Sequence, residues 1–158
     1  MGDLPRWIPA FAGMTWPVFC AQCRANTGTY LTGTVTGGPT FAAGHGRDGV
    51  ELSHTNLKLM SDQNGRSYDV DIDNVFATGH DGADESVPTP LSTIRTGDRL
   101  ELCGKLYTDG RPGVDWVHTN CGETPRAVQP DGWLKIVSSE GALGPNLEDS
   151  REYCRLWR

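Results

Sequence analysis

Alternating apolar and polar positions recur along the middle of the chain, and this pattern predicts β-strands. In residues 68–76, Tyr68, Val70 and Ile72 alternate with three aspartates. Such period-two alternation places the apolar side chains on one face of a strand and the polar ones on the other. Alternating or β-branched composition predicts further strands over residues 29–36, 50–60, 99–107, 114–119 and 131–137.

Turn signals separate these segments. Asn64-Gly65 supplies the positive φ angles that a type I′ turn requires, so the strands on either side of it are expected to form a hairpin. Residues 37–49 are rich in glycine and are predicted to form a loop. Residues 77–97 are rich in Gly, Asp, Pro and Ser, and we expect a long connection there with one helical turn near residues 90–95.

Five or six antiparallel strands, with glycines inside several of them and a long break before the fourth, predict an all-β fold. The arrangement resembles a small barrel of the OB (oligonucleotide/oligosaccharide-binding) type, and a β-sandwich is the alternative. We therefore expect a β-barrel domain over residues 29–137 and a tail with a short helix over residues 138–158. Residues 1–28 are predicted to be a disordered leader that is not a native part of the fold.

Composition and charge exclude several classes of protein. The chain has 158 residues, the size of one domain, and its 20 Gly and 10 Pro argue against a helical bundle. No stretch approaches the roughly 20 apolar residues that a membrane-spanning helix needs. The net charge is -6 and the basic residues are scattered, so we expect no nucleic-acid partner.

Cysteine usage indicates the compartment. One C-x-x-C motif without a second ligand pair is not a zinc motif, and its downstream residues do not read as a helix of thioredoxin type. Structural disulfides in a periplasmic or secreted protein remain, although no signal peptide is legible. The odd number leaves a thiol that is free or joins two chains, so we expect a monomer or a disulfide-linked dimer. The five cysteines are Cys20, Cys23, Cys103, Cys121 and Cys154.

A hairpin turning about Pro112 separates apolar from polar side chains on the last two long strands. That register places Cys103 opposite Cys121, within reach of a disulfide. It also turns Trp116 and His118 toward the same face as the apolar side chains of residues 99–107. The sequence therefore predicts a Cys103–Cys121 disulfide and an inward-facing Trp-x-His segment.

Three short motifs resemble a family of small exported bacterial proteins known only as a domain of unknown function. They are a Gly-Asp strand, a Trp-x-His segment after a glycine-rich turn, and a closing Gly-Trp, at residues 97–104, 113–118 and 132–134. The resemblance covers about residues 29–137 and is specific over 97–134. The family has a second histidine directly after Trp-x-His, where this chain has Thr119. The resemblance implies an exported, compact β domain and no activity.

Two functional hypotheses follow from the residues. The first is a non-catalytic binding module that presents Trp116, His118, Trp133 and Tyr107 to an extended ligand, such as a saccharide or a protein partner. The alternative is a small hydrolase that uses His118 or His80 with a carboxylate, with or without a divalent metal. No set of cysteines, histidines and carboxylates has metal-site spacing, so we expect no metal and no cofactor.

Overall fold

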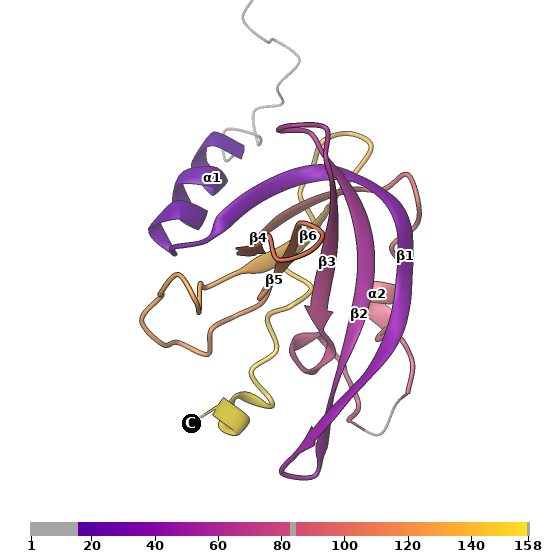
Figure 1. Ribbon diagram of the computed structural model, residues 1–158, viewed down its shortest axis with the longest axis vertical. Helices are drawn as coiled ribbons and strands as arrows, with labels where there is room; N and C mark the ends of the chain where they lie inside the picture. Colours follow the sequence, from indigo (N-terminus) through magenta and orange to yellow (C-terminus); the bar gives the residue numbers. More distant parts are fainter. Residues whose placement is uncertain (1–15, 83–84, 158) are drawn as a thin grey trace, which may run out of the picture.

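A computed structural model describes residues 16–82 and 85–157, and it confirms the all-β class (Figure 1). Among the described residues, no helix is long and apolar enough to cross a membrane. The strands are β1 (Thr29–Arg47), β2 (Val50–Ser61), β3 (Ser67–Asp73), β4 (Arg99–Tyr107), β5 (Gly113–Asp115) and β6 (Trp133–Val137). The helices are α1 (Trp16–Ala25), α2 (Thr89–Ser92) and the 3₁₀ turns η2 (Asn74–Phe76) and η3 (Cys154–Trp157).

The six strands form one mixed sheet whose hydrogen bonds run in a ring. The strand order is β1-β2-β3-β5-β4-β6, and an additional pairing joins β1 to β4. Residues 29–34 of β1 pair with β4, and the strand pairs with β2 from Gly33 to Arg47. We expected antiparallel strands throughout, but β3 and β5 pair in parallel. The long connection between β3 and β4 makes the parallel pairing possible, because the chain crosses the sheet there before β4 and β5 form.

The glycine-rich segment predicted as a loop over residues 37–49 instead continues β1 as far as Arg47. Its register against β2 shifts in three places, one of them at Gly38-Pro39. Gly38 has a φ of 82°, and a Cβ there would lie 2.5 Å from the backbone oxygen of Asn56. Glycine therefore lets the strand bulge rather than end.

Apolar side chains from all the strands of the ring form the main core. Tyr68, Val70 and Ile72 of β3 are buried, as the alternation predicts. Leu91 of α2 and Ile94 belong to the same cluster. The connection between β3 and β4 therefore covers part of the core in addition to spanning the sheet.

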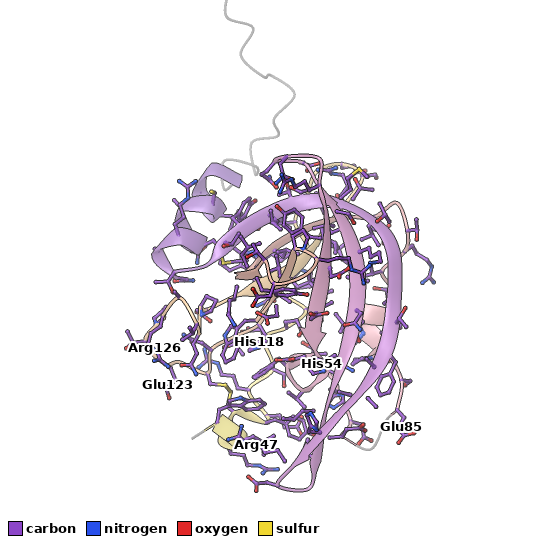
Figure 2. The ribbon with its side chains drawn as sticks, in the orientation of Figure 1. Arg47, His54, Glu85, His118, Glu123 and Arg126 are labelled. Atoms are coloured by element: carbon purple, nitrogen blue, oxygen red, sulfur yellow. A yellow bond between two sulfur atoms is a disulfide. The ribbon has the colours of Figure 1, made fainter. Side chains whose placement is uncertain are left out.

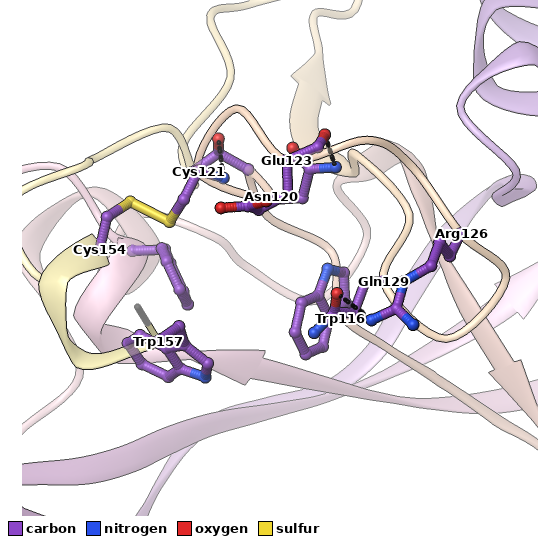
Figure 3. A pocket seen from close by; sticks show the side chains of 10 residues that line it. Trp116, Asn120, Cys121, Glu123, Arg126, Gln129, Cys154 and Trp157 are labelled. Carbon is purple, nitrogen blue, oxygen red and sulfur yellow. Dashed lines mark hydrogen bonds between the residues drawn. A yellow bond between two sulfur atoms is a disulfide. The ribbon is translucent and has the colours of Figure 1, made fainter.

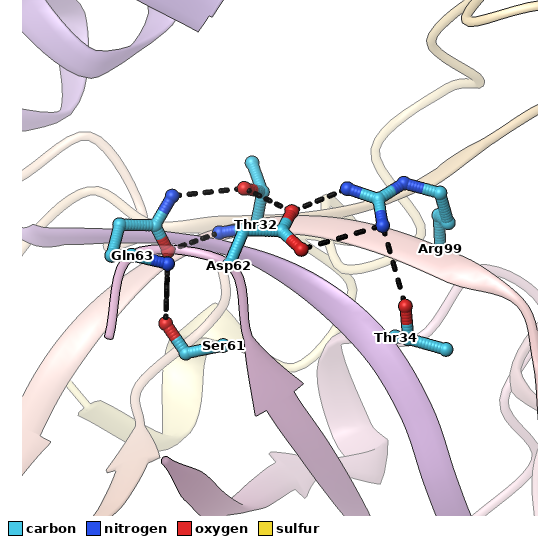
Figure 4. Close-up of polar contacts among 6 residues, drawn as sticks. All are labelled: Thr32, Thr34, Ser61, Asp62, Gln63 and Arg99. Atoms are coloured by element: carbon cyan, nitrogen blue, oxygen red, sulfur yellow. Dashed lines mark hydrogen bonds and ion pairs between the residues drawn. The ribbon is translucent and has the colours of Figure 1, made fainter. Parts of the chain in front are cut away.

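Polar side chains brace the sheet where β1 meets both of its neighbours (Figure 4). Arg99 of β4 forms an ion pair with Asp62, which lies in the turn after β2. The Thr32 hydroxyl donates to Asp62 Oδ2 at 2.8 Å, and Gln63 Nε2 donates to Thr32 Oγ1 at 2.9 Å. Three segments far apart in the sequence are thus connected at this junction.

The predicted hairpin exists, but its register is wrong. β4 has the expected bounds, whereas Lys105 pairs with Asp115 and Leu106 with Val114, so the turn is centred before Pro112. β5 ends at Asp115, because Trp116 adopts a φ of 55° and the chain leaves the sheet there. Residues beyond Trp116 therefore have no strand partner in β4.

The predicted Cys103–Cys121 disulfide is wrong for the same reason. Cys103 forms a disulfide with Cys23, and Cys121 forms one with Cys154. The left-handed backbone at Trp116 carries Cys121 away from β4 and toward η3. Both cysteines expected in a disulfide do form one, but with other partners.

The two ends of the described chain belong to the fold. We expected residues 16–28 to be disordered, but they contain helix α1, which the Cys23–Cys103 disulfide attaches to β4. Residues 1–15 of the predicted leader lie outside the described residues. The short helix expected in the tail is η3, where Leu156 packs in a second apolar cluster with Phe76.

Candidate functional site

A pocket of about 280 Å³ opens between η3 and the loop that follows β5 (Figure 3). Trp116 and Trp157 stand on opposite sides of its opening. Phe76 also lines the pocket. The Cys121–Cys154 disulfide forms another part of the wall. The pocket therefore combines aromatic side chains from three segments that are distant in the sequence.

Polar side chains of one loop complete the lining. Asn120 Nδ2 donates to the backbone oxygen of Glu123 at 2.8 Å, and Arg126 Nη2 donates to Gln129 Oε1 at 2.6 Å. The backbones of Arg126 and Gln129 also exchange two hydrogen bonds. These bonds hold the planar amide and guanidinium groups in place at the wall of the pocket.

The backbone is strained at two lining residues. Trp116 and Cys121 have φ angles of 55° and 64°, in the left-handed region that side chains other than glycine rarely adopt. Among the described residues, four non-glycine residues have a positive φ, and two of them line this pocket. Strained residues concentrate at binding and active sites, which supports a functional role for the pocket.

The tip of the β1–β2 hairpin borders the pocket. The Arg47 guanidinium lies 5.6 Å from the centre of the Trp157 ring, within the range of a cation–π contact. The ring of Trp157 also lies 5.1 Å from that of Phe76. Trp157 is therefore held between the hairpin and the second apolar cluster.

His118 lies directly beneath the pocket rather than in its lining. Its side chain has 0% exposure, and its ring stacks on Phe76 at 3.8 Å with an interplanar angle of 10°. The Trp116 ring lies 4.6 Å away. Nδ1 is 2.7 Å from the backbone oxygen of Thr119, and Nε2 is 3.0 Å from Asp73 Oδ2. The Nε2 contact lies within ion-pair distance but departs from the geometry of a hydrogen bond.

Asp73 of β3 is shared by two histidines, one in β2 and one, His118, in the loop after β5. His54 of β2 lies opposite Asp73 in the strand register, and its Nε2 is 2.7 Å from Asp73 Oδ1 (Figure 2). Burial alone would raise the pKa of Asp73, but contacts with His118 and His54 hold it well below its usual range. The hydrogen bond with Asp73 raises the pKa of His54, whose side chain is 39% exposed. Partial burial opposes this shift but does not cancel it.

Near Asp73 and its two histidines, several polar side-chain atoms are buried without a hydrogen-bond partner among the described residues. They belong to Asp115, Trp116 and Glu148. Burial raises the pKa of Glu148, and the charge of Asp73 raises it further. Burial also raises the pKa of Asp115. Of the three carboxyls, Asp73 is the one whose pKa is lowered, and it is the one with two histidine partners.

The four residues predicted to bind ligand do not converge on one surface. Trp116 lines the pocket and His118 supports it from behind. Trp133 is only 6% exposed and donates through Nε1 to Glu101 Oε1 at 3.1 Å in the cluster under α1. The Tyr107 hydroxyl donates to Asp71 Oδ2 at 2.7 Å and is not part of the pocket lining.

The sequence analysis missed the other half of the site. Trp157 and Phe76 lie in segments without regular alternation, so periodicity gave no reason to place them together. Asp73 appears in the sequence as one of three aspartates on the polar face of a strand, and no sequence pattern pairs His54 with it. The one available signal was Cys154, three residues before Trp157, because a disulfide in the tail would attach that tail to the domain.

Among the described residues, no group of three or more cysteine, histidine or acidic side chains is arranged to hold a metal ion. No protein-family model matches the chain, and no curated protein matches its sequence significantly. The resemblance to the exported family therefore stays a prediction, and the function has to be inferred from the pocket.

Proposed function

We propose that the chain is a non-catalytic, OB-like binding module whose pocket between Trp116 and Trp157 holds a sugar ring of an extended saccharide. The single observation that carries this proposal is the pair of tryptophans on opposite sides of the opening. Indole faces stack on the apolar C–H faces of sugar rings and supply large contact area with little loss of side-chain entropy.

The polar lining supports the same ligand class. Sugar hydroxyls both donate and accept, so they suit a lining that offers amide, guanidinium and carboxylate groups together. Asn120, Gln129, Arg126 and Glu123 offer this mixture from one loop. A pocket of about 280 Å³ lies at the small end of ligand sites, which favours one ring in the pocket and the rest of the ligand outside.

The strand pairing supports the OB-like assignment. A ring of five strands in the order β1-β2-β3-β5-β4, closed by β1–β4 pairing, is the expected connectivity of a small Greek-key barrel. A β-sandwich would divide these strands between two sheets, whereas all six belong to one. Barrels of this type bind oligosaccharides as well as nucleic acids, and the acidic charge disfavours the latter.

Burial favours binding over hydrolysis. His118 is paired with a carboxylate, as the hydrolase hypothesis requires, but it is 0% exposed. His80 is 7% exposed and packs edge-on against Tyr153. Neither imidazole can touch a substrate in this conformation.

Two disulfides within the chain also support a periplasmic or secreted location.

Tryptophan fluorescence titrations with cellotetraose, chitotetraose and maltotetraose test the proposal. We expect saturable binding of at least one of them, and a loss of about tenfold or more in affinity for Trp157→Ala and for Gln129→Ala. Leu106→Ala, an exposed apolar side chain outside the pocket lining, is the matched control and should bind like the parent protein.

Failure of all three saccharides to change the fluorescence would contradict the proposal. So would binding that survives both pocket variants, because the ligand would then occupy another surface. Circular dichroism of each variant checks that the fold is retained.

A further inference from the structure

His118 contacts three residues that line the pocket, although it does not line the pocket itself. Its ring lies against Phe76 and Trp116, and its Nδ1 contacts the backbone oxygen of Thr119. A change in the charge or position of this ring therefore reaches the pocket wall directly.

Both ring nitrogens face oxygen atoms that can only accept hydrogen bonds. The backbone carbonyl of Thr119 carries no proton, so Nδ1 must donate to it. A neutral ring would then turn the lone pair of Nε2 toward Asp73 Oδ2 at 3.0 Å, and the two would repel each other. Asp73 Oδ1 also lies 2.7 Å from His54 Nε2, a contact of the kind that an ionised carboxylate makes. The contacts at Nδ1 and Nε2 together point to a proton on each nitrogen of the His118 ring.

We propose that His118 is a buried imidazolium that positions Trp116, so that ligand binding in the pocket depends on the protonation of this ring. The ligand part of this inference rests on the proposed function. The part that concerns the charge of His118 and the position of Trp116 does not depend on any ligand.

The aromatic neighbours explain how the charge acts on the pocket. Phe76 stacks against the His118 ring, and Trp116 lies against it at a tilt of 39°. A cation near aromatic faces is attracted to them, and the attraction is strongest away from water. Trp116 needs such support, because its backbone is held at a φ of 55°. Loss of the proton removes both this attraction and the ion pair with Asp73.

The other charged groups around His118 set the direction of the effect. Asp73 of β3 is its counter-ion and is shared with His54 of β2. Asp115 of β5 and Glu148 lie nearby, and the backbone of Glu148 accepts a hydrogen bond from Thr119. Burial raises the pKa of Asp115 and of Glu148. Asp73 is the carboxylate that lies within ion-pair distance of both His118 and His54.

Nitrogen NMR of the histidine rings tests the charge directly. At about pH 6 we expect the His118 ring to show two N–H protons and the nitrogen shifts of an imidazolium. A single protonated nitrogen at that pH would overturn the proposal. His118→Gln identifies the signals, and His45→Gln, an exposed histidine on the β1–β2 hairpin, is the matched control.

The pH dependence of binding tests the positioning role. We expect the affinity for the saccharide found above to fall about tenfold or more between about pH 6 and pH 9. His118→Gln should bind weakly with the same affinity at both values, because its amide cannot be charged. His45→Gln should follow the parent protein. His54→Gln should keep the pH dependence, which separates the two histidines that share Asp73.

Two results would overturn the positioning role: equal affinity at both pH values, or the parental pH profile in His118→Gln. If no saccharide binds at any pH, the proposed function fails, and the fluorescence of the free protein decides this inference. An imidazolium quenches a neighbouring indole, so the difference between the parent and Trp116→Phe should rise with pH. If His118→Gln does not fold, Asp73→Asn should lower the pH at which this change occurs.

Discussion

At the scale of the residue, Glu148 shows how strongly burial acts on a single ionisable group. Its side chain has 0% exposure, and neither carboxyl oxygen has a partner among the described residues. An ionised carboxylate in such a place would be very costly, so the folded chain favours the neutral acid. Folded Glu148 therefore keeps its proton at pH values at which the unfolded chain has released it.

This difference predicts the pH at which a substitution of Glu148 matters. Below its ordinary pKa of 4.5 both states hold the proton, and the group adds no pH-dependent cost to folding. As the pH rises toward the raised pKa of the folded state, the free energy of unfolding falls. We therefore expect Glu148→Gln to raise the midpoint of thermal unfolding at about pH 8 but to change it little at about pH 4.

Thermal melts of the two proteins at both pH values measure this effect, with the exposed Glu140→Gln as control. A Glu148→Gln protein that is less stable than the parent at about pH 8 would contradict the prediction. It would mean that the carboxylate is ionised and has a partner that the substitution removes.

At the scale of the element, two short helices depend on disulfides for their place. A ten-residue helix and a four-residue 3₁₀ turn are too short to be stable by themselves in water. Cys23–Cys103 attaches α1 to β4, and Cys121–Cys154 attaches η3 to the loop that carries Trp116. The second disulfide also positions Trp157, so it contributes to the pocket as well as to stability.

We expect the double variant Cys121→Ser/Cys154→Ser to lose both stability and the pocket. The cysteines are 33 residues apart, and closing a loop of that size is worth roughly 4 kcal/mol in the chain-entropy description. Urea denaturation measures the loss, and saccharide titration measures the pocket. Cys20→Ser is the matched control, because Cys20 is the free cysteine of the described chain. Equal midpoints for the double variant and the control would contradict the prediction.

Local patterns predicted the elements better than they predicted the contacts between them. The bounds of β4 agree with the sequence, and the buried face of β3 follows from alternation alone. The partners of Cys103 and Cys121 could not be predicted, because they depend on the left-handed backbone at Trp116. Nothing in the local sequence requires that conformation, and one such residue changes the direction of all that follow.

The candidate site was predictable to the same limited extent. Trp116 was identified from its position on a strand, but Trp157 lies in a tail without periodicity. The pairing of His54 with Asp73 depends on the register of two strands, which their compositions alone do not determine. Sequence patterns thus identified Trp116 on one side of the pocket, whereas the position of Trp157 on the other side depends on tertiary structure.

At the scale of the whole molecule, the ring of strands closes at Gly33. This residue pairs with Ser61 of β2 on one side and with Leu100 of β4 on the other. A Cβ at this position would lie 2.3 Å from the backbone oxygen of Met60 and 2.9 Å from the side chain of Leu59. The chain therefore needs glycine at position 33 of this junction.

Gly33→Ala should therefore destabilise the whole fold, whereas the same substitution at Gly46 should not. The added methyl group of Gly33→Ala meets backbone atoms that cannot move without separating β1 from β2, and overpacking of this kind costs about 1–3 kcal/mol. At Gly46, on the same strand, a Cβ meets nothing within 4 Å. Gly46→Ala should therefore be neutral or slightly stabilising, because it reduces the freedom of the unfolded chain.

Urea denaturation of the two variants compares them directly, and hydrogen exchange locates the change. We expect faster exchange in both β1–β2 and β1–β4 for Gly33→Ala, because one residue serves both pairings. Faster exchange in the β1–β2 pairing alone would show that the β1–β4 pairing holds without it.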